Sequence, residues 1–283
     1  MEHAASLLPK GKSWQLAWND EFDGDTLDRS KWDFRLHLLQ HRHPTFTDEG
    51  VVVKDGCAHL NLIERDGHFF SPHLQTGYNY LDRPGNSFCF GGQYTWPISK
   101  LREHKFLHTF GYYECRARLQ QNPGWWSAFW LQSPVIGCCL DPAMAGVEID
   151  IMENFTRDRV VSSNLHWNGY GDDHQSAGSG PVDAGETADG FHLFGCEWSE
   201  AGYTFYVDGR QTAHFDGPVS RQPQFILIST ECMGYRTDGK PDPLLKGSVP
   251  DAFVVDFVRV YEAIPTCRFP WPTFTRTSGR RRG

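Results

Sequence analysis

The sequence contains no run of ~18 apolar residues, which is the length that a membrane-spanning helix requires. Its first ten residues also lack the apolar core of a signal peptide. We therefore expect no membrane partner. The protein either stays inside the cell or has had a leader removed, and the sequence leaves both alternatives open.

Positively charged residues are also outnumbered by negatively charged ones, with 27 Lys and Arg against 35 Asp and Glu and a formal net charge of −8. A protein that binds nucleic acid needs a positive surface to neutralise phosphates. The acidic balance therefore argues against nucleic acid as a partner. The one basic cluster, Arg280 to Arg282, lies at the end of the sequence, where we expect a solvated tail.

The eight cysteines include no Cys-x-x-Cys pair, which argues against a zinc ribbon. A chain of 283 residues can bury a full core and does not need disulfides for stability. Cys115 and Cys196 lie in strand-like segments, where we expect buried thiols. The adjacent Cys138 and Cys139 cannot easily bridge each other, and they either stay free or pair elsewhere.

Helical patterns, heptads, internal repeats and low-complexity linkers are missing as well. No stretch of about 12 residues shows the 3.6-residue period of a capped helix. The 28 glycines and 17 prolines are spread along the chain, which is typical of many turns within one domain. Alternation with a period of two recurs instead, as in β-strands with one buried face.

The strand pattern is clearest in two segments. In the run 112–119 every second side chain is apolar. The segment 203–207 also alternates, and it is followed by Asp208-Gly209, a strong hairpin signal because both turn positions favour positive φ. Further strands are predicted near 51–54, 58–63, 127–132, 147–153, 160–167, 194–198, 224–231 and 252–261.

Ten or more short strands separated by turns predict an all-β fold, an antiparallel β-sandwich. Longer loops are expected on its rim at 41–50, 66–99, 169–190 and 235–250. Because loops on a rigid scaffold often carry function, we expect the functional residues on the concave face and in these loops.

Aromatic side chains are abundant, with 20 Phe, 10 Trp and 10 Tyr making up 14% of the chain. Many of them are expected to pack between the sheets. Ten tryptophans, however, exceed what a core needs. Flat aromatic faces are the usual means of holding a sugar ring, whose axial hydrogens form an apolar surface, so the composition suggests a carbohydrate ligand.

The most informative run is GVEIDIME at 146–153, which places three acids among apolar residues. On a regular strand Glu148 and Asp150 share a face, and Glu153 points to the opposite one. A one-residue bulge at Ile151-Met152 would return Glu153 to the face of the other two acids. Without it, the Glu153 carboxylate would enter the apolar interior at a large desolvation cost.

Two carboxyl groups ~5–5.5 Å apart are what a retaining glycosidase uses, one as nucleophile and the other as acid and then base. A bulged, curved strand with inward-leaning side chains would bring Glu148 and Glu153 near that separation. Crowding the acids should raise the pKa of at least one of them. Two alternatives remain open here, a cation site such as calcium and a solvated acidic face. A calcium loop is normally turn-like and contains glycine, whereas this run is strand-like.

The sequence resembles glycoside hydrolase family 16, in the bulged-motif branch that includes laminarinases and agarases. The signature Glu-x-Asp-x-x-Glu stands here as EIDIME, and supporting segments follow in the family's order from Trp14 to Glu262. Each segment is weak alone, but their order is specific. The segments are WNDEF at 18–22, FGYYECRA at 110–117, WWSAFWL at 125–131, FYVDG at 205–209 and VDFVRVY at 255–261.

The resemblance implies a β-jelly roll of two curved sheets with an open concave substrate cleft. It assigns Glu148 as the nucleophile, Glu153 as the acid/base, and Asp150 as the residue between them that orients the nucleophile. It also implies cleavage of internal β-linkages in glucans or galactans with retention of configuration. A polysaccharide is then the partner, no cofactor is required, and we expect a monomer.

The resemblance implies one catalytic domain, which we place at 14–265, with an N-terminal tail at 1–13 and a C-terminal tail at 266–283. Because the implied substrates are polysaccharides, a secreted or periplasmic location is expected, although no signal peptide is visible in the sequence.

The family match also indicates residues that bind substrate. Trp126 and Trp130 are four apart on one strand, so they share a face and would serve as sugar platforms, with core packing as the alternative. Trp125 should point away. His166 is similar to a family histidine that faces the acid/base, and Asn164 lies two residues before it.

Other assignments follow from less specific matches. Glu231 departs from the family pattern and would either add a fourth acid to the cleft or pair with Arg236. Arg116 lies on the polar face of its strand, where it contacts substrate or forms an ion pair. Glu21 and Asp256 match positions at which the family often holds a structural calcium, although Glu21 could instead cap a turn.

We favour a β-1,3- or mixed β-1,3/1,4-glucan as substrate, with an agar- or carrageenan-type galactan as the alternative. A transglycosylase would share the covalent intermediate, and a lectin-like jelly roll would bind without catalysis. A lectin would have no need for both Glu148 and Glu153. Because the net charge is acidic, a sulfated chain is disfavoured. It would call for cationic side chains in the cleft, for which the candidates are Arg83, Arg116, Arg236 and Lys240.

Overall fold

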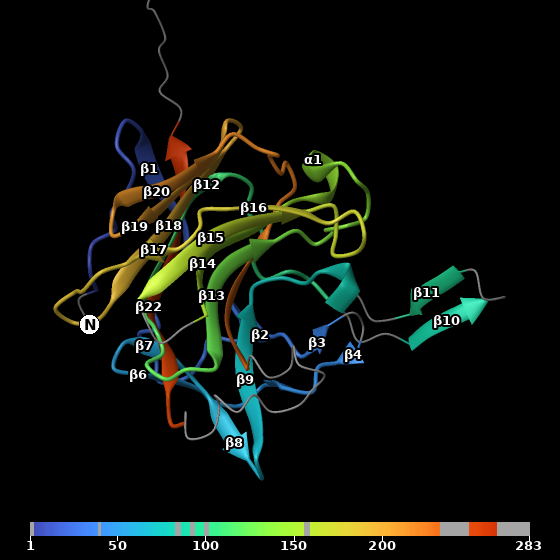
Figure 1. The fold of residues 1–283 in the computed structure, drawn as a ribbon, viewed down its shortest axis with the longest axis horizontal. Helices are drawn as coiled ribbons and strands as arrows, with labels where there is room; N and C mark the ends of the chain where they lie inside the picture. The colour runs from blue at the N-terminus through green and yellow to red at the C-terminus, as the bar shows by residue number, and fades with distance from the viewer. Residues whose placement is uncertain are drawn as a thin grey trace, which may run out of the picture.

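The computed structural model describes residues 3–38, 41–82, 86–90, 94–98, 102–155, 159–232 and 249–264. Within them, two large sheets of antiparallel strands form a sandwich, as predicted (Figure 1). Several predictions concern residues outside these ranges. They are the cationic candidates Arg83, Arg236 and Lys240, most of the loop at 235–250 and the tail at 266–283.

The first sheet has eight strands in the order β20-β19-β18-β12-β22-β7-β6, and β1 pairs with β22 outside this path. Every pairing in it is antiparallel. Its strands are β1 (Ser13–Asp20), β6 (Val51–Lys54), β7 (Cys57–Asn61), β12 (Gly111–Arg118), β18 (His192–Ser199), β19 (Gly202–Val207), β20 (Arg210–Phe215) and β22 (Ala252–Ile264).

The second sheet has ten strands in the order β16-β15-β14-β13-β21-β9-β2, with β17 beside β15 and with β5 and β8 beside β9. Only the short pairing of β5 with β9 is parallel among its described strands. The strands are β2 (Asp33–Phe34), β5 (Phe46–Thr47), β8 (Ile63–Arg65), β9 (His68–Gln75), β13 (Trp125–Gln132), β14 (Glu148–Asn154), β15 (Val160–Trp167), β16 (Gln175–Gly178), β17 (Val182–Asp183) and β21 (Phe225–Cys232).

Small elements decorate the sandwich. Two hairpins are formed by β3 (His37–Leu38) with β4 (His41–Arg42) and by β10 (Asn86–Phe90) with β11 (Tyr94–Ile98), the second of which projects to the right in Figure 1. The helical elements are the single turns η1 (Tyr80–Asp82) and α1 (Pro142–Ala145). None of the helices in the described ranges has the length and apolarity needed to span a membrane.

The core lies between the two sheets and confirms the period-two patterns. In β12, Tyr113, Cys115 and Ala117 are fully buried in one apolar cluster. Phe129 of β13 and Leu165 of β15 enter the same cluster from the other sheet. Apolar side chains that alternate toward a shared interior provide the main driving force for such a sandwich. The predicted turn at 208–209 is also present, with positive φ at both residues.

The prediction of a long rim loop at 66–99 is wrong in its first part, because β9 (His68–Gln75) lies there between β21 and β2. This strand has no clean alternation, since nearly all of its side chains are buried, polar ones included. Leu74 faces the core, whereas His73 and Gln75 are buried polar residues. Pro72 also argues against a strand by sequence, although it lies opposite Thr47 of the short parallel neighbour β5.

An N-terminal segment covers part of the eight-stranded sheet on the face away from the core. The backbone N–H of Leu7 donates to Glu114 of β12 (2.9 Å), and Arg259 of β22 donates to the Ala4 carbonyl (2.9 Å). Glu114 is fully buried beneath this segment, and burial raises the pKa of its carboxyl group. Residues 3–9 therefore act as a cover for polar groups on the outer sheet surface.

We expect Phe129→Ala to lower the free energy of unfolding by about 3–5 kcal/mol, because it leaves a cavity in the centre of the core. Leu16→Ala, at an exposed position of β1, is the matched control and should change the free energy by less than about 0.5 kcal/mol. Urea unfolding of both variants measures the difference. Equal effects would contradict the assignment of the core.

Candidate active site

The strand β14 contains the predicted one-residue bulge. From Asp150 to Glu153 the chain takes three steps, whereas their partners on β13, Trp130 and Ala128, are two steps apart. The pairing with β15 shifts in the same interval. The extra residue therefore returns Glu153 to the face that carries Glu148 and Asp150.

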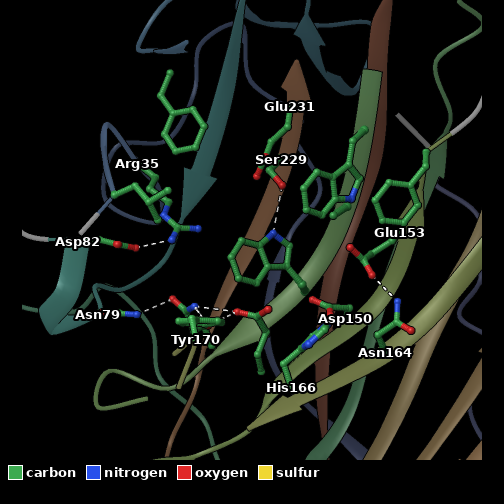
Figure 2. A pocket seen from close by; sticks show the side chains of 18 of the residues that line it. Arg35, Asn79, Asp82, Asp150, Glu153, Asn164, His166, Tyr170, Ser229 and Glu231 are labelled. Atoms are coloured by element: carbon green, nitrogen blue, oxygen red, sulfur yellow. Dashed lines mark hydrogen bonds and ion pairs between the residues drawn. The ribbon is translucent and has the colours of Figure 1, made fainter. Parts of the chain in front are cut away.

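All three acids line one cavity of about 520 Å³ on the face of the ten-stranded sheet that looks away from the core (Figure 2). This volume is typical of a site for a small molecule or a few sugar rings. Its walls come from β13, β14, β15 and β21 and from the loops beside them. The lining residues are Arg35, Leu38, Phe46, Asn79, Asp82, Trp126, Ala128, Trp130, Gln132, Glu148, Asp150, Glu153, Phe155, Asn164, His166, Tyr170, His174, Ser229 and Glu231.

Glu148 lies at the start of β14 with its carboxylate held by two donors. Gln132 Nε2 donates to Glu148 Oε2 (2.8 Å), and the Tyr170 hydroxyl donates to the same oxygen. Asn79 in turn donates to Gln132 Oε1 (2.9 Å), which fixes the orientation of the amide. Because both donors bind Oε2, a nucleophilic role would fall to the other oxygen, Oε1.

Glu153 is buried in the cavity wall, and its surroundings favour its protonated form. Burial, the neighbouring Asp150 and, more weakly, Glu148 raise its pKa to about 9, although Asn164 donates to its Oε2 and opposes the shift. Its side chain is therefore protonated near neutral pH. A carboxylic acid that keeps its proton at neutral pH can act as a general acid.

Asp150 lies between the two glutamates and is nearly fully buried. Burial, and then the charge of Glu148, raise its pKa. His166 Nε2 lies 3.3 Å from Asp150 Oδ2, while its Nδ1 lies 2.9 Å from His174 Nε2. Asp150 is thus linked through His166 to the loop that follows β15.

The structure shows the shared face of the two tryptophans, and their role as sugar platforms stays a prediction. Trp126 and Trp130 of β13 both line the cavity, and Trp126 stacks on Phe155 with ring centroids 4.9 Å apart. Trp130 donates its Nε1–H to Ser229 Oγ (3.1 Å), which fixes its indole. Trp125 points to the other side of the strand, into a small apolar cluster.

The wall across from the acids carries the one permanent cation among the described lining residues, Arg35. Its guanidinium group forms a buried ion pair with Asp82 and lies 5.2 Å from the ring centroid of Trp130. Burial opposes its charge, but Asp82 and the other anionic groups nearby outweigh this and raise the pKa of Arg35. Glu231 also lies on this wall, with Oε1 4.0 Å from His73 Nε2.

The predicted contact of Arg116 with substrate is corrected by the structure. Arg116 lies on β12 in the eight-stranded sheet, where it forms ion pairs with Asp256 and Asp189. Of the two possibilities for this strand face, the ion pair is the one observed. Alternation correctly assigned Arg116 to a polar face, but it could not tell that this face belongs to the other sheet.

The residues predicted to bind calcium do not fit a hard cation. Glu21 accepts two hydrogen bonds from Arg259, and Asp256 pairs with His3 and Arg116. Calcium requires oxygen ligands with free lone pairs and net negative charge. These carboxylates are instead neutralised by cationic side chains.

Several cavity residues were missed by sequence reasoning. Gln132 could have been found, because it continues the face of Trp126 and Trp130 two residues further along β13. Arg35, Asn79 and Tyr170 lie outside regular strands and therefore show no periodic signal. Only the folded chain brings these loop residues beside β13 and β14.

The model of glycosyl hydrolases family 16 matches residues 92–229. The chain is 27% identical over 274 residues to glucan endo-1,3-beta-glucosidase A1 of Niallia circulans, covering 87% of this chain but only 38% of that protein. It is 26% identical to the beta-glucanase of Rhodothermus marinus, covering 89% of this chain and 86% of the relative.

Among solved structures, the chain is similar to the catalytic domain of an endo-1,3-beta-glucanase (laminarinase) from Thermotoga petrophila. The TM-score is 0.64 at 25% sequence identity, and the match covers 89% of this chain and 99% of that one. The sandwich is therefore the jelly roll that the sequence predicted.

The raised pKa of Glu153 predicts a pH dependence of stability. Because this pKa moves from 4.5 to about 9 on folding, the folded protein holds an extra proton between these values, and its stability falls as pH rises through them. In Glu153→Gln the fall from about pH 5 to about pH 9 should be smaller by at least ~1 kcal/mol.

Urea unfolding at both pH values measures this difference. Glu49→Gln, an exposed site, is the control and should keep the wild-type dependence. Parallel pH profiles for wild type and Glu153→Gln would contradict the assignment.

Proposed function

Because the chain belongs to glycosyl hydrolases family 16 and is a glycoside hydrolase, we propose that it is an endo-acting, retaining β-glycanase of β-1,3- or mixed β-1,3/1,4-glucans. The observation that carries this proposal is the bulge of β14. It sets Glu148 and Glu153 on one cavity wall, with one carboxyl group held by donors and the other kept protonated.

In the first step, Glu148 Oε1 attacks the anomeric carbon while the bond from that carbon to the leaving oxygen breaks. Glu153 gives its proton to the leaving oxygen, so no alkoxide has to depart. The products are a glycosyl ester on Glu148 and a shortened chain with a new hydroxyl group. Asp150, held by His166, supports the nucleophile from the same strand face.

In the second step, the ionised Glu153 takes a proton from water as the water oxygen attacks the anomeric carbon. The ester bond to Glu148 breaks and its carboxylate is restored. Two inversions at one carbon give net retention. A sugar hydroxyl in place of water would give transglycosylation, which differs only in the acceptor.

The charge of the cavity supports a neutral polysaccharide over a sulfated one. Its described walls carry five acidic side chains, of which Asp82 is paired with Arg35 and Glu153 is protonated, and no cation on these walls is left over to pair with a sulfate. A sulfate ester would meet like charges in an enclosed space, at a cost that binding would have to offset. Trp126 and Trp130 offer apolar faces for neutral sugar rings instead.

The other properties of the proposal follow from its substrate class. We propose that the enzyme works as a monomer without a required cofactor. We also propose that it acts in a secreted or periplasmic location, where polysaccharides are met. A lectin-like function is the alternative from another class, and it is disfavoured because binding alone needs no buried, protonated Glu153.

We expect Glu148→Gln to lose at least about 10³-fold in kcat while still binding oligosaccharide, because an amide cannot attack the anomeric carbon. Glu148→Ala with added azide should regain turnover and yield a glycosyl azide of inverted configuration. Glu186→Gln, at an exposed site, is the control. Wild-type turnover by Glu148→Gln would refute the nucleophile assignment.

Glu153→Gln should slow cleavage of polysaccharide far more than cleavage of aryl glycosides with good leaving groups, because only poor leaving groups need the proton. Steady-state kinetics on both substrate types measures the ratio of the two losses. An equal loss on both would count against an acid role for Glu153.

The cavity charge predicts substrate choice. Release of reducing ends should be seen with laminarin or lichenan, and no release with carrageenan, whose sulfates meet the acidic walls. Agarose, an unsulfated galactan, tests linkage and sugar type without the charge effect. Cleavage of carrageenan in preference to the glucans would reject the glucan proposal, and binding without release from any polymer would favour the lectin.

A further inference from the structure

Tyr170 is the one residue from the rim loops that contacts the proposed nucleophile through a hydrogen bond in the described structure. It belongs to the loop 168–174 between β15 and β16. Its hydroxyl reaches Glu148 Oε2, although the side chain remains 47% exposed (Figure 2). Neither solubility nor packing requires an aromatic loop residue to form a hydrogen bond with Glu148. The contact therefore indicates a functional role for Tyr170.

The direction of the hydrogen bonds around Tyr170 is fixed by its neighbours. Asn79 donates to Gln132 Oε1, so the Gln132 nitrogen is the donor to Glu148 and to the Tyr170 oxygen (2.5 Å). The Tyr170 oxygen already accepts from Gln132, and its own proton therefore goes to Glu148. The ring is half exposed, but the hydroxyl group lies in the cavity, where burial and the nearby Glu148 charge raise the pKa of Tyr170, so the phenol keeps this proton.

The loop is held in place at two further points. Asn168 and Gly169 both have positive φ, which turns the chain back toward the cavity directly after β15. A Cβ placed on Gly137 would lie 2.9 Å from the Gly169 Cα, so the two loops touch through their backbones. At the other end of the loop, His174 contacts His166 (2.9 Å).

We propose that Tyr170 is a positioning residue that, together with Gln132, holds Glu148 Oε2 and thereby directs Oε1 to the anomeric carbon. The proposal rests on the retaining mechanism above and deepens it. Two donors on one oxygen fix the carboxylate rotamer and concentrate its negative charge on the atom that does not react.

The same donors act differently on the two steps. In the glycosyl ester Glu148 carries no negative charge. The hydrogen bond from the Tyr170 hydroxyl to Glu148 Oε2 is therefore weak at this stage. Negative charge returns to Oε2 as the ester breaks, and Tyr170 then donates to a forming carboxylate. The second step therefore gains more from Tyr170 than the first, because an interaction that strengthens toward the transition state accelerates the step.

Tyr170→Phe tests this inference, with an activated aryl β-oligoglycoside of the sugar that the wild type cleaves. We expect kcat to fall about tenfold or more. KM should fall with it, because the glycosyl ester accumulates, and a burst of phenol should precede the steady state. Tyr206→Phe, the same change in the eight-stranded sheet, is the matched control and should leave all three readouts unchanged.

A higher KM with unchanged kcat would show that Tyr170 only contacts substrate, and this result would overturn the proposal. Unchanged kinetics would overturn it as well. A lower kcat without a burst, at constant KM, would also do so, because it would place the loss before the ester forms.

A second measurement does not depend on turnover, so it separates failure of this inference from failure of the proposed function. Melting temperatures of wild type, Tyr170→Phe, Glu148→Ala and the double variant form a thermodynamic cycle. We expect Tyr170→Phe to lower the melting temperature of wild type by more than that of Glu148→Ala, in which only the hydrogen bond from Gln132 to the Tyr170 hydroxyl remains to be lost. Equal shifts in both backgrounds would show no coupling between the two side chains and would overturn the proposal.

Discussion

Three carboxyl groups can share one face of a strand across six positions only if the strand gains a residue between the second and the third. The extra residue in β14 meets this constraint, and the rest of the site depends on it. Without it Glu153 would point into the core beside Phe129, and its carboxyl group would meet no Asn164 and no second acid. With it, burial and neighbouring charge raise the pKa of Glu153, so that a protonated acid stands on the same face as Glu148, which is the arrangement that acid–nucleophile chemistry requires.

The sandwich could be predicted from the sequence because the strands that form its two inner faces alternate between apolar and polar residues. Segments such as 112–119 and 203–207 alternate, and they are confirmed as β12 and β19. The strand β9 could not be found in this way, since it is covered on both faces and carries Pro72. Where burial is nearly complete and half of the buried residues are polar, alternation no longer separates inside from outside.

In the site, too, some residues could be predicted from the sequence and others could not. Spacing along one strand predicted the shared face of the acids and of Trp126 and Trp130, because only strand geometry was needed. It could not decide which of two sheets a polar face belongs to, and Arg116 was therefore misplaced. Tyr170 and Arg35 reach the cavity from loops, and their places are set by turns and contacts distant in the sequence. These contacts depend on the tertiary structure, which no local pattern encodes.

The backbone contact between Gly137 and Gly169 has a consequence for how such enzymes diversify. Neither loop tolerates a side chain at this crossing, so a longer or bulkier version of one would displace the other, and Tyr170 with it. The segment before β14 and the segment after β15 must therefore change together. Transplanting either loop alone into a related scaffold would disturb the cavity around Glu148, whereas exchanging both as a pair would conserve it.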